Sequence, residues 1–197
     1  MHLQPFRQGR LDGLCGVYSV INAARLAIWP AHQLSVGSCV YLFGLMTTKL
    51  AGRAKLLDVL TGGSRHVLVG TLLREVDTWL TEAYGVRLRY HRPYRSQPSV
   101  SPAAIVATLA QHLAAGHASA IAGLSGSIEH WTVVRAVRPK TMLLFDSDDL
   151  KRLPLDPARR GRLSVEVVAN ELFLIRCERQ KSAMRTAARR TAASRQT

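Results

Sequence analysis

One cysteine of the chain lies where a nucleophile would be placed. The stretch "RQGRLDGLCGVYSVINA" puts Cys15 between a polar loop that contains glycines and an apolar pattern with helical spacing. The unpaired N–H groups and the positive dipole end at a helix amino terminus favour a thiolate. Asp12, three residues earlier, is a natural N-cap. These residue types and their spacing predict that Cys15 is a reactive thiol in the first turn of a helix.

A thiolate nucleophile also needs a proton partner, usually an imidazole that a third group orients. The run "HWTVVRAVRPKTMLLFDSDD" predicts two antiparallel strands joined by a turn centred on its Arg-Pro dipeptide. Pairing across that turn places His130 opposite Ser147, with Asp146 and Asp148 beside it. Because the two carboxylates share a face, Asp146 and Asp148 are both candidates for orienting the imidazole.

Attack of a thiolate on a carbonyl produces an oxyanion, which needs hydrogen-bond donors. The backbone N–H of Cys15 is one candidate donor. The side-chain amide of Gln8, in the loop before the helix, is another. The sequence therefore supplies, in order, a glutamine, a cysteine, a histidine and an aspartate that suit nucleophilic chemistry at a carbonyl.

This order resembles the papain-like cysteine peptidases, most closely the bacterial branch that includes the bacteriocin-processing, double-glycine leader peptidases. The resemblance rests on "QGRLDGLCGVYSVINA" and "HWTVVRAVRPKTMLLFDSDD". It implies Cys15 as the nucleophile, His130 as the base, Asp146 as the orienting acid and Gln8 as part of the oxyanion hole. Gln8 precedes Cys15 by seven residues where the family pattern has about six, so Gln4 stays an alternative.

The remaining patterns predict the elements that must position these residues. Apolar spacing predicts helices over 14–28, 35–50 and 71–84, with "TGGSRHVLVG" as a loop, and a further helix that Ser101 caps and that ends before Gly116. Short runs rich in β-branched and apolar residues predict antiparallel strands at 86–91, 119–124, 130–137, 141–146 and 171–177. The predicted fold class is α+β and papain-like, with a helical first half and a mostly antiparallel sheet in the second.

Length and composition predict one catalytic domain over residues 1–177. With 197 residues, 47% of them apolar, the chain can bury a core without disulfides or metal. Three cysteines without a CxxC pair argue against a disulfide framework or a metal site, and Cys39 and Cys177 fit apolar packing positions. We therefore expect no metal and no cofactor.

Basic residues are concentrated at the carboxyl end. The net charge is +14, and residues 176–197 contain seven Lys or Arg and one acid. We expect residues 178–197 to be a disordered basic tail, with solubility or weak contact with nucleic acid or another acidic surface as its role. No apolar run reaches the roughly 20 residues of a membrane span, and no secretory signal begins the chain. A cytoplasmic location is the expectation.

The sequence thus predicts a cysteine peptidase that hydrolyses a peptide or isopeptide bond. The basic body favours an acidic or flexible peptide, or the tail of a small protein such as a ubiquitin-like modifier that ends in glycine. Two alternatives stay open. The same residues could transfer an acyl group to an amine, as in transglutaminase-like enzymes, or the fold could be a catalytically inactive basic binding module.

Overall fold

The computed structural model describes residues 3–8, 13–29, 31–52, 56–97, 99–156 and 165–179. The helices are α1 (Cys15–Ile28), α2 (Val36–Gly52), α3 (Leu56–Gly62), α4 (His66–Tyr84) and α5 (Pro102–Ala114). The strands are β1 (Val86–His91), β2 (Ala118–Gly126), β3 (His130–Arg138), β4 (Thr141–Leu144), β5 (Arg152–Pro154) and β6 (Val165–Arg179).

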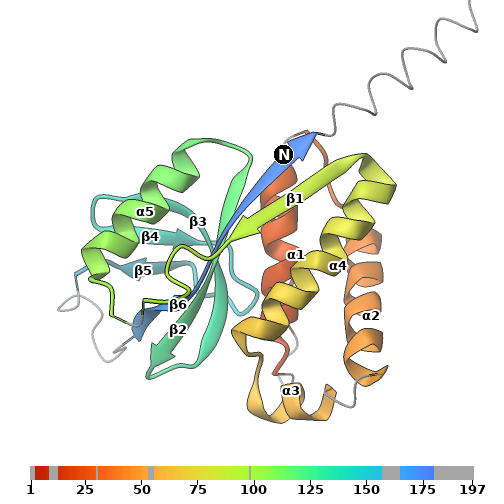
Figure 1. Cartoon of the computed structure of the whole chain (residues 1–197), viewed down its shortest axis with the longest axis horizontal. Coiled ribbons are helices and arrows are strands. Elements are labelled where there is room, and N and C mark those ends of the chain that lie inside the picture. The colour runs from red at the N-terminus through yellow and green to blue at the C-terminus, as the bar shows by residue number, and fades with distance from the viewer. Residues whose placement is uncertain are drawn as a thin grey trace, which may run out of the picture.

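The strands form one six-stranded sheet in the order β1-β6-β2-β3-β4-β5. Every pairing among the described strands is antiparallel. The long strand β6 pairs with β1 along one edge and with β2 along the other, and it runs through the middle of the view in Figure 1. The mixed helical and antiparallel fold class predicted from the sequence is confirmed.

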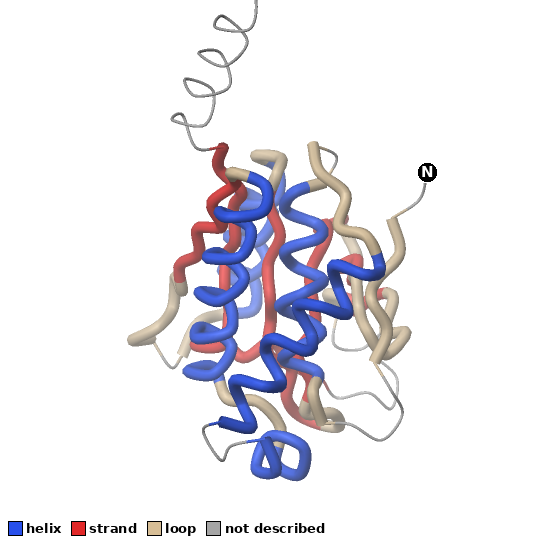
Figure 2. The backbone as a smooth tube through the Cα atoms, turned by 90° about the vertical axis from the view of Figure 1, so that its right-hand side faces the viewer, coloured by secondary structure: helices blue, strands red, loops and turns tan. Residues whose placement is uncertain are grey.

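Helices cover both faces of this sheet. On one face α1 packs against β2 and β3, and α4 packs against β1. On the other face α5 packs against β2, β3 and β6. Figures 1 and 2 show α5 on one side of the sheet and the layer of α1, α2 and α4 on the other. Alternate strand residues therefore enter two cores: Ile121 and Val133 face α1, whereas Ala120 and Val134 face α5.

The helix α1 is the centre of the larger core. The sequence predicted one apolar face, but α1 is buried on nearly all sides, because α2 and α4 cover the side that the sheet does not. Its N-cap residue is Leu14, which makes no side-chain capping bond. Asp12, the predicted N-cap, lies outside the described residues. Cys15 nevertheless lies in the first turn of the helix, as predicted, and is its first residue.

The segment predicted as a loop between residues 61 and 70 is mostly helical. The helix α4 begins at His66, before the predicted start at residue 71, and the short helix α3 precedes it. Only Val59 of α3 is buried, so this helix lacks the apolar period that reveals longer ones. The true loop is 63–65, and Gly63 takes a positive φ there.

The other predicted elements agree with the structure to within a few residues, apart from two strands. The Ser101 side chain accepts from the backbone N–H of Ala104 and caps α5. β5 was not predicted, and β6 is longer than its predicted run. β6 continues through Arg179, and residues 180–197 of the basic tail lie outside the described residues.

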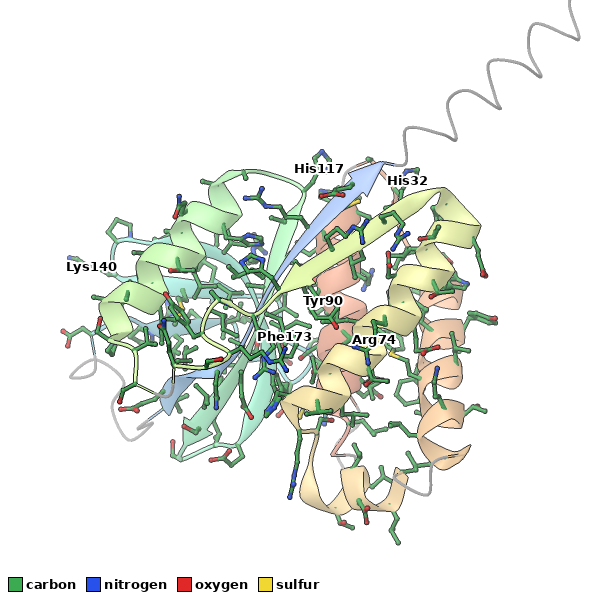
Figure 3. All side chains as sticks on the ribbon, in the orientation of Figure 1. His32, Arg74, Tyr90, His117, Lys140 and Phe173 are labelled. Atoms are coloured by element: carbon green, nitrogen blue, oxygen red, sulfur yellow. The ribbon has the colours of Figure 1, made fainter. Side chains whose placement is uncertain are left out.

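Tyr90 and Phe173 lie where the sheet meets α4 (Figure 3). The Tyr90 hydroxyl donates to the carbonyl of Gly70 in α4 at 2.9 Å, and its ring packs on Phe173 of β6 with centroids 5.9 Å apart. None of the helices in the described part of the chain combines the length and the apolar character needed to cross a membrane.

Candidate active site

His130, half-buried at the start of β3, is hydrogen-bonded to the buried Asp146, which follows β4. Nε2 of His130 lies 2.8 Å from Oδ2 of Asp146, and Asp146 is only 4% exposed. The other carboxylate oxygen, Oδ1, accepts the backbone N–H groups of Asp148 at 2.8 Å and Leu150 at 3.3 Å. Both oxygens of Asp146 are thus engaged, one holding the imidazole and one holding the turn after β4. Of the two predicted carboxylates, Asp146 contacts His130, and the exposed Asp148 contributes its backbone to the turn.

The predicted hairpin register was wrong. The structure pairs Arg138 with Thr141, so the turn lies at Pro139 and Lys140. A further register shift falls between Val134 and Ala136. The second shift partly reverses the first, so Val134 pairs with Leu144, one residue beyond the predicted Leu143. A carboxylate still reaches the imidazole because acidic residues follow β4 in close succession.

Cys15, at the start of α1, acts on the same imidazole. Burial alone would lower the pKa of His130, but the hydrogen bonds to Asp146 and Cys15 and the charges of both groups outweigh it and raise the pKa to about 10. Asp146 occupies Nε2, so Nδ1 is the ring nitrogen left to face the sulfur. Beside a Cys15 thiolate, the His130 imidazole therefore carries a proton at neutral pH.

The environment of Asp146 keeps this carboxyl ionised. Burial raises the pKa of Asp146, but the hydrogen bond and charge of His130 outweigh burial and hold the pKa below its ordinary value. The buried Thr132 hydroxyl acts in the same direction, although it makes no hydrogen bond of standard geometry. The pair can therefore hold a protonated imidazole in one orientation.

Three contacts fix the cysteine helix against the histidine strand. Ser19, one turn after Cys15, donates from its hydroxyl to the carbonyl of Trp131 at 2.7 Å. The Trp131 indole donates to the carbonyl of Ser64 at 2.6 Å. A Cβ on Gly16 would come within 2.5 Å of the Ser64 side chain, so the loop 63–65 packs directly on the helix start. Sequence reasoning missed Ser19 and Ser64, although a serine among the apolar residues at the start of α1 was a signal for Ser19.

The chain before α1 brings Gln8 to the same turn. The backbone of Phe6 exchanges two hydrogen bonds with the fully buried Asn22 side chain, at 2.6 and 3.0 Å. The backbone N–H of Gln8 donates to the carbonyl of Ser147 at 3.1 Å, and the Ser147 hydroxyl donates to Oε1 of Gln8 at 3.2 Å. Gln4, the alternative, accepts from Arg25 at its backbone carbonyl, and its side chain is exposed. The structure therefore places Gln8 beside the His130–Asp146 pair.

Two of the surface cavities lie at the imidazole and at the loop that packs on the helix start. One of about 510 Å³ adjoins the imidazole and is lined by Ile128, Glu129, His130, Asp146, Asp148, Asp149 and Leu150. The other, of about 560 Å³, adjoins the loop 63–65 and is lined by Asp58, Val59, Gly62, Gly63, Arg65, Val67, Leu68 and Thr71. The first is acidic at its rim, although Asp149 forms an ion pair with Arg7. The second is mixed, with apolar side chains from α3 and α4.

The other two cysteines lie away from this group. Cys39 is fully buried, and burial raises the pKa of its thiol. Cys177 is half-buried near the end of β6. Within the described ranges, no three His, Cys, Asp or Glu side chains are placed to hold a metal ion.

Comparison with known proteins gives one similar structure. The fold is similar to the crystal structure of the peptidase domain of Streptococcus ComA, a bi-functional ABC transporter involved in a quorum sensing pathway. The TM-score is 0.48 and the identity 15%, over 91% of this chain and 100% of that one. No family model and no curated protein matches the sequence. We therefore base the function on the side-chain geometry alone.

Proposed function

We propose that the protein is a cysteine peptidase in which Cys15 is the nucleophile, His130 the proton carrier and Asp146 the orienting acid. The observation that carries this proposal is the His130–Asp146 hydrogen bond beside Cys15 at the head of a helix, where the hydrogen bond and charge of Cys15 help to raise the pKa of His130. Such an arrangement matches the general pattern of a nucleophile, its base and a third group that orients the base.

The first step follows from the charges of the resting group. The protonated His130 stabilises a Cys15 thiolate, whose sulfur attacks the carbonyl carbon of the scissile bond. The oxyanion that forms is stabilised by the backbone N–H of Cys15 and by the side-chain amide of Gln8. The first N–H groups of a helix have no acceptor within that helix, so the Cys15 N–H is suited to this role.

The imidazole of His130 then first donates a proton and later accepts one. The proton of His130 passes to the leaving amine as the C–N bond breaks, which leaves a thioester on Cys15. The neutral imidazole removes a proton from water, which attacks the thioester and releases the acid and the thiolate. Asp146 remains ionised and holds the ring in place throughout.

The substrate class that fits is an extended peptide or the tail of a small protein, laid between the two cavities. The acidic rim beside His130 disfavours acidic residues on that side of the scissile bond. The positive charge of the protein can still attract an acidic peptide or a ubiquitin-like protein. The acidic segments of such a substrate would then bind on the protein surface away from this cavity.

Alkylation by iodoacetamide across pH, measured at each cysteine by mass spectrometry, tests the reactive pair. We expect Cys15 to be alkylated at least about tenfold faster than the half-buried Cys177 near pH 6, and to lose this advantage in His130→Ala. Equal rates at the two cysteines in the native protein would contradict the proposal. A peptide library then tests hydrolysis, because new termini should appear with the native protein and not with Cys15→Ala.

A further inference from the structure

Two adjacent residues contact the two groups that assist Cys15. Asp146 holds the imidazole of His130, and Ser147, the next residue, contacts Gln8. Both are nearly inaccessible, at 4% and 3% exposure. The turn that contains them is fixed by the two backbone N–H groups that Asp146 accepts. One rigid turn therefore holds the base and lies against the candidate oxyanion donor.

The backbone of Gln8 is anchored without the Ser147 hydroxyl. Its N–H donates to the Ser147 carbonyl, a contact that any residue at 147 can provide. Two residues earlier, the buried Asn22 side chain holds the backbone of Phe6. What the Ser147 hydroxyl adds is a contact at 3.2 Å with the side-chain carbonyl oxygen of Gln8.

That contact matters because the two ends of an amide are chemically opposite. Only the –NH₂ group can donate to an oxyanion, whereas the carbonyl oxygen would repel it. We propose that Ser147 is a positioning residue that holds the Oε1 of Gln8 and so presents the –NH₂ group to the oxyanion formed at Cys15. This inference rests on the proposed function, in which Gln8 is an oxyanion donor.

Two reagents separate oxyanion stabilisation from thiol reactivity. With p-nitrophenyl acetate, the Cys15 sulfur bonds to the acetyl carbon, the C–O bond breaks, and p-nitrophenolate leaves, with an oxyanion on the acetyl oxygen in between. With iodoacetamide, the sulfur displaces iodide at a saturated carbon, and no oxyanion forms. The ratio of the two rates, each corrected by the rate of Cys15→Ala, therefore reports the oxyanion hole.

We expect Gln8→Ala to lower the acylation rate about 10²-fold and Ser147→Ala to lower it about tenfold, with alkylation unchanged within about twofold. In a Gln8→Ala background, Ser147→Ala should cause no further loss, because the hydroxyl acts only through the amide. Ser147→Thr, which keeps the hydroxyl, should retain most of the native rate. Ser99→Ala, an exposed serine away from the turn, is the matched control.

The outcomes test the positioning role of Ser147 separately from the cysteine peptidase function. If Gln8→Ala slows acylation but Ser147→Ala does not, the positioning role is overturned and the proposed function stands. The positioning role is also overturned if Ser147→Ala slows alkylation equally, or if it remains harmful in the Gln8→Ala background, since either result describes a general structural role. If the native Cys15 undergoes neither reaction faster than an ordinary thiol, the proposed function itself fails.

Discussion

Asp146 and Asp148 flank Ser147, and only the first contacts His130. The pKa of His130 reaches about 10 because the hydrogen bonds and charges of Asp146 and Cys15 outweigh burial, which acts in the opposite direction. If the charge of Asp146 is removed and its shape is kept, burial should lower the pKa of His130 with less opposition. Asp148, two positions away, provides the control.

We expect Asp146→Asn to lower the pKa of His130 well below 10, because the substituted amide still fits the turn but carries no charge. Asp148→Asn should leave the pKa of His130 near its native value, because that side chain is exposed and does not contribute to the raised pKa of the ring. Titration of the His130 ring followed by NMR measures both. A larger change in the pKa of His130 in Asp148→Asn than in Asp146→Asn would contradict the prediction and assign the orienting role to Asp148.

At the scale of elements, the position of the cysteine helix depends on a close approach at Gly16. No side chain fits there, since a Cβ would lie 2.5 Å from both side-chain heavy atoms of Ser64. The same loop carries the carbonyl that receives the Trp131 indole, so α1, β3 and the loop 63–65 are fixed together. A displaced loop would therefore disturb both the helix start and the strand of His130.

We expect Gly16→Ala to lower the free energy of unfolding by about 1–3 kcal/mol through this overpacking. The matched control is Gly44→Ala in α2, where a Cβ meets nothing within 4 Å. There the higher helix propensity of alanine should stabilise the protein by up to about 1 kcal/mol. Chemical denaturation of both variants measures the pair, and equal effects of the two substitutions would refute the packing argument.

At the scale of the whole molecule, the His130–Asp146 pair links stability to pH. The pKa of His130 is raised above 6.5, so its contribution is complete below pH 6.5 and is lost as pH rises toward about 10. The pKa of Asp146 is lowered, so its contribution is present above pH 3.8 and is lost as pH falls below that value. The pair should therefore stabilise the fold most between about pH 4 and 6.5.

The difference in unfolding free energy between the native protein and His130→Gln should be largest in that window and should shrink toward pH 10. Denaturant titrations at several pH values measure it. Ser99→Ala replaces an exposed residue that does not titrate and should give a difference with little dependence on pH in the same range. A constant difference for His130→Gln would show that the raised pKa of His130 makes no contribution to folding.

Local patterns in the sequence determined much of this protein. The helix that begins at Cys15, the capped helix α5 and the strands that begin at Val86 and His130 follow from apolar period, capping and turn residues, which act over a few positions. The residue types of the candidate site, and their order along the chain, were also readable. The short helix α3 was not, because one buried residue makes no period.

Only the tertiary structure decided which of these residues meet. The contact of Asp146 rather than Asp148 with His130 depended on the turn after β4, and the position of Gln8 rather than Gln4 beside that turn depended on Asn22 and Ser147. Ser147 and Gln8 are 139 positions apart, and Ser19 and the Trp131 carbonyl are 112 apart. Contacts over such separations leave no periodic trace in the sequence, because each depends on how whole elements pack.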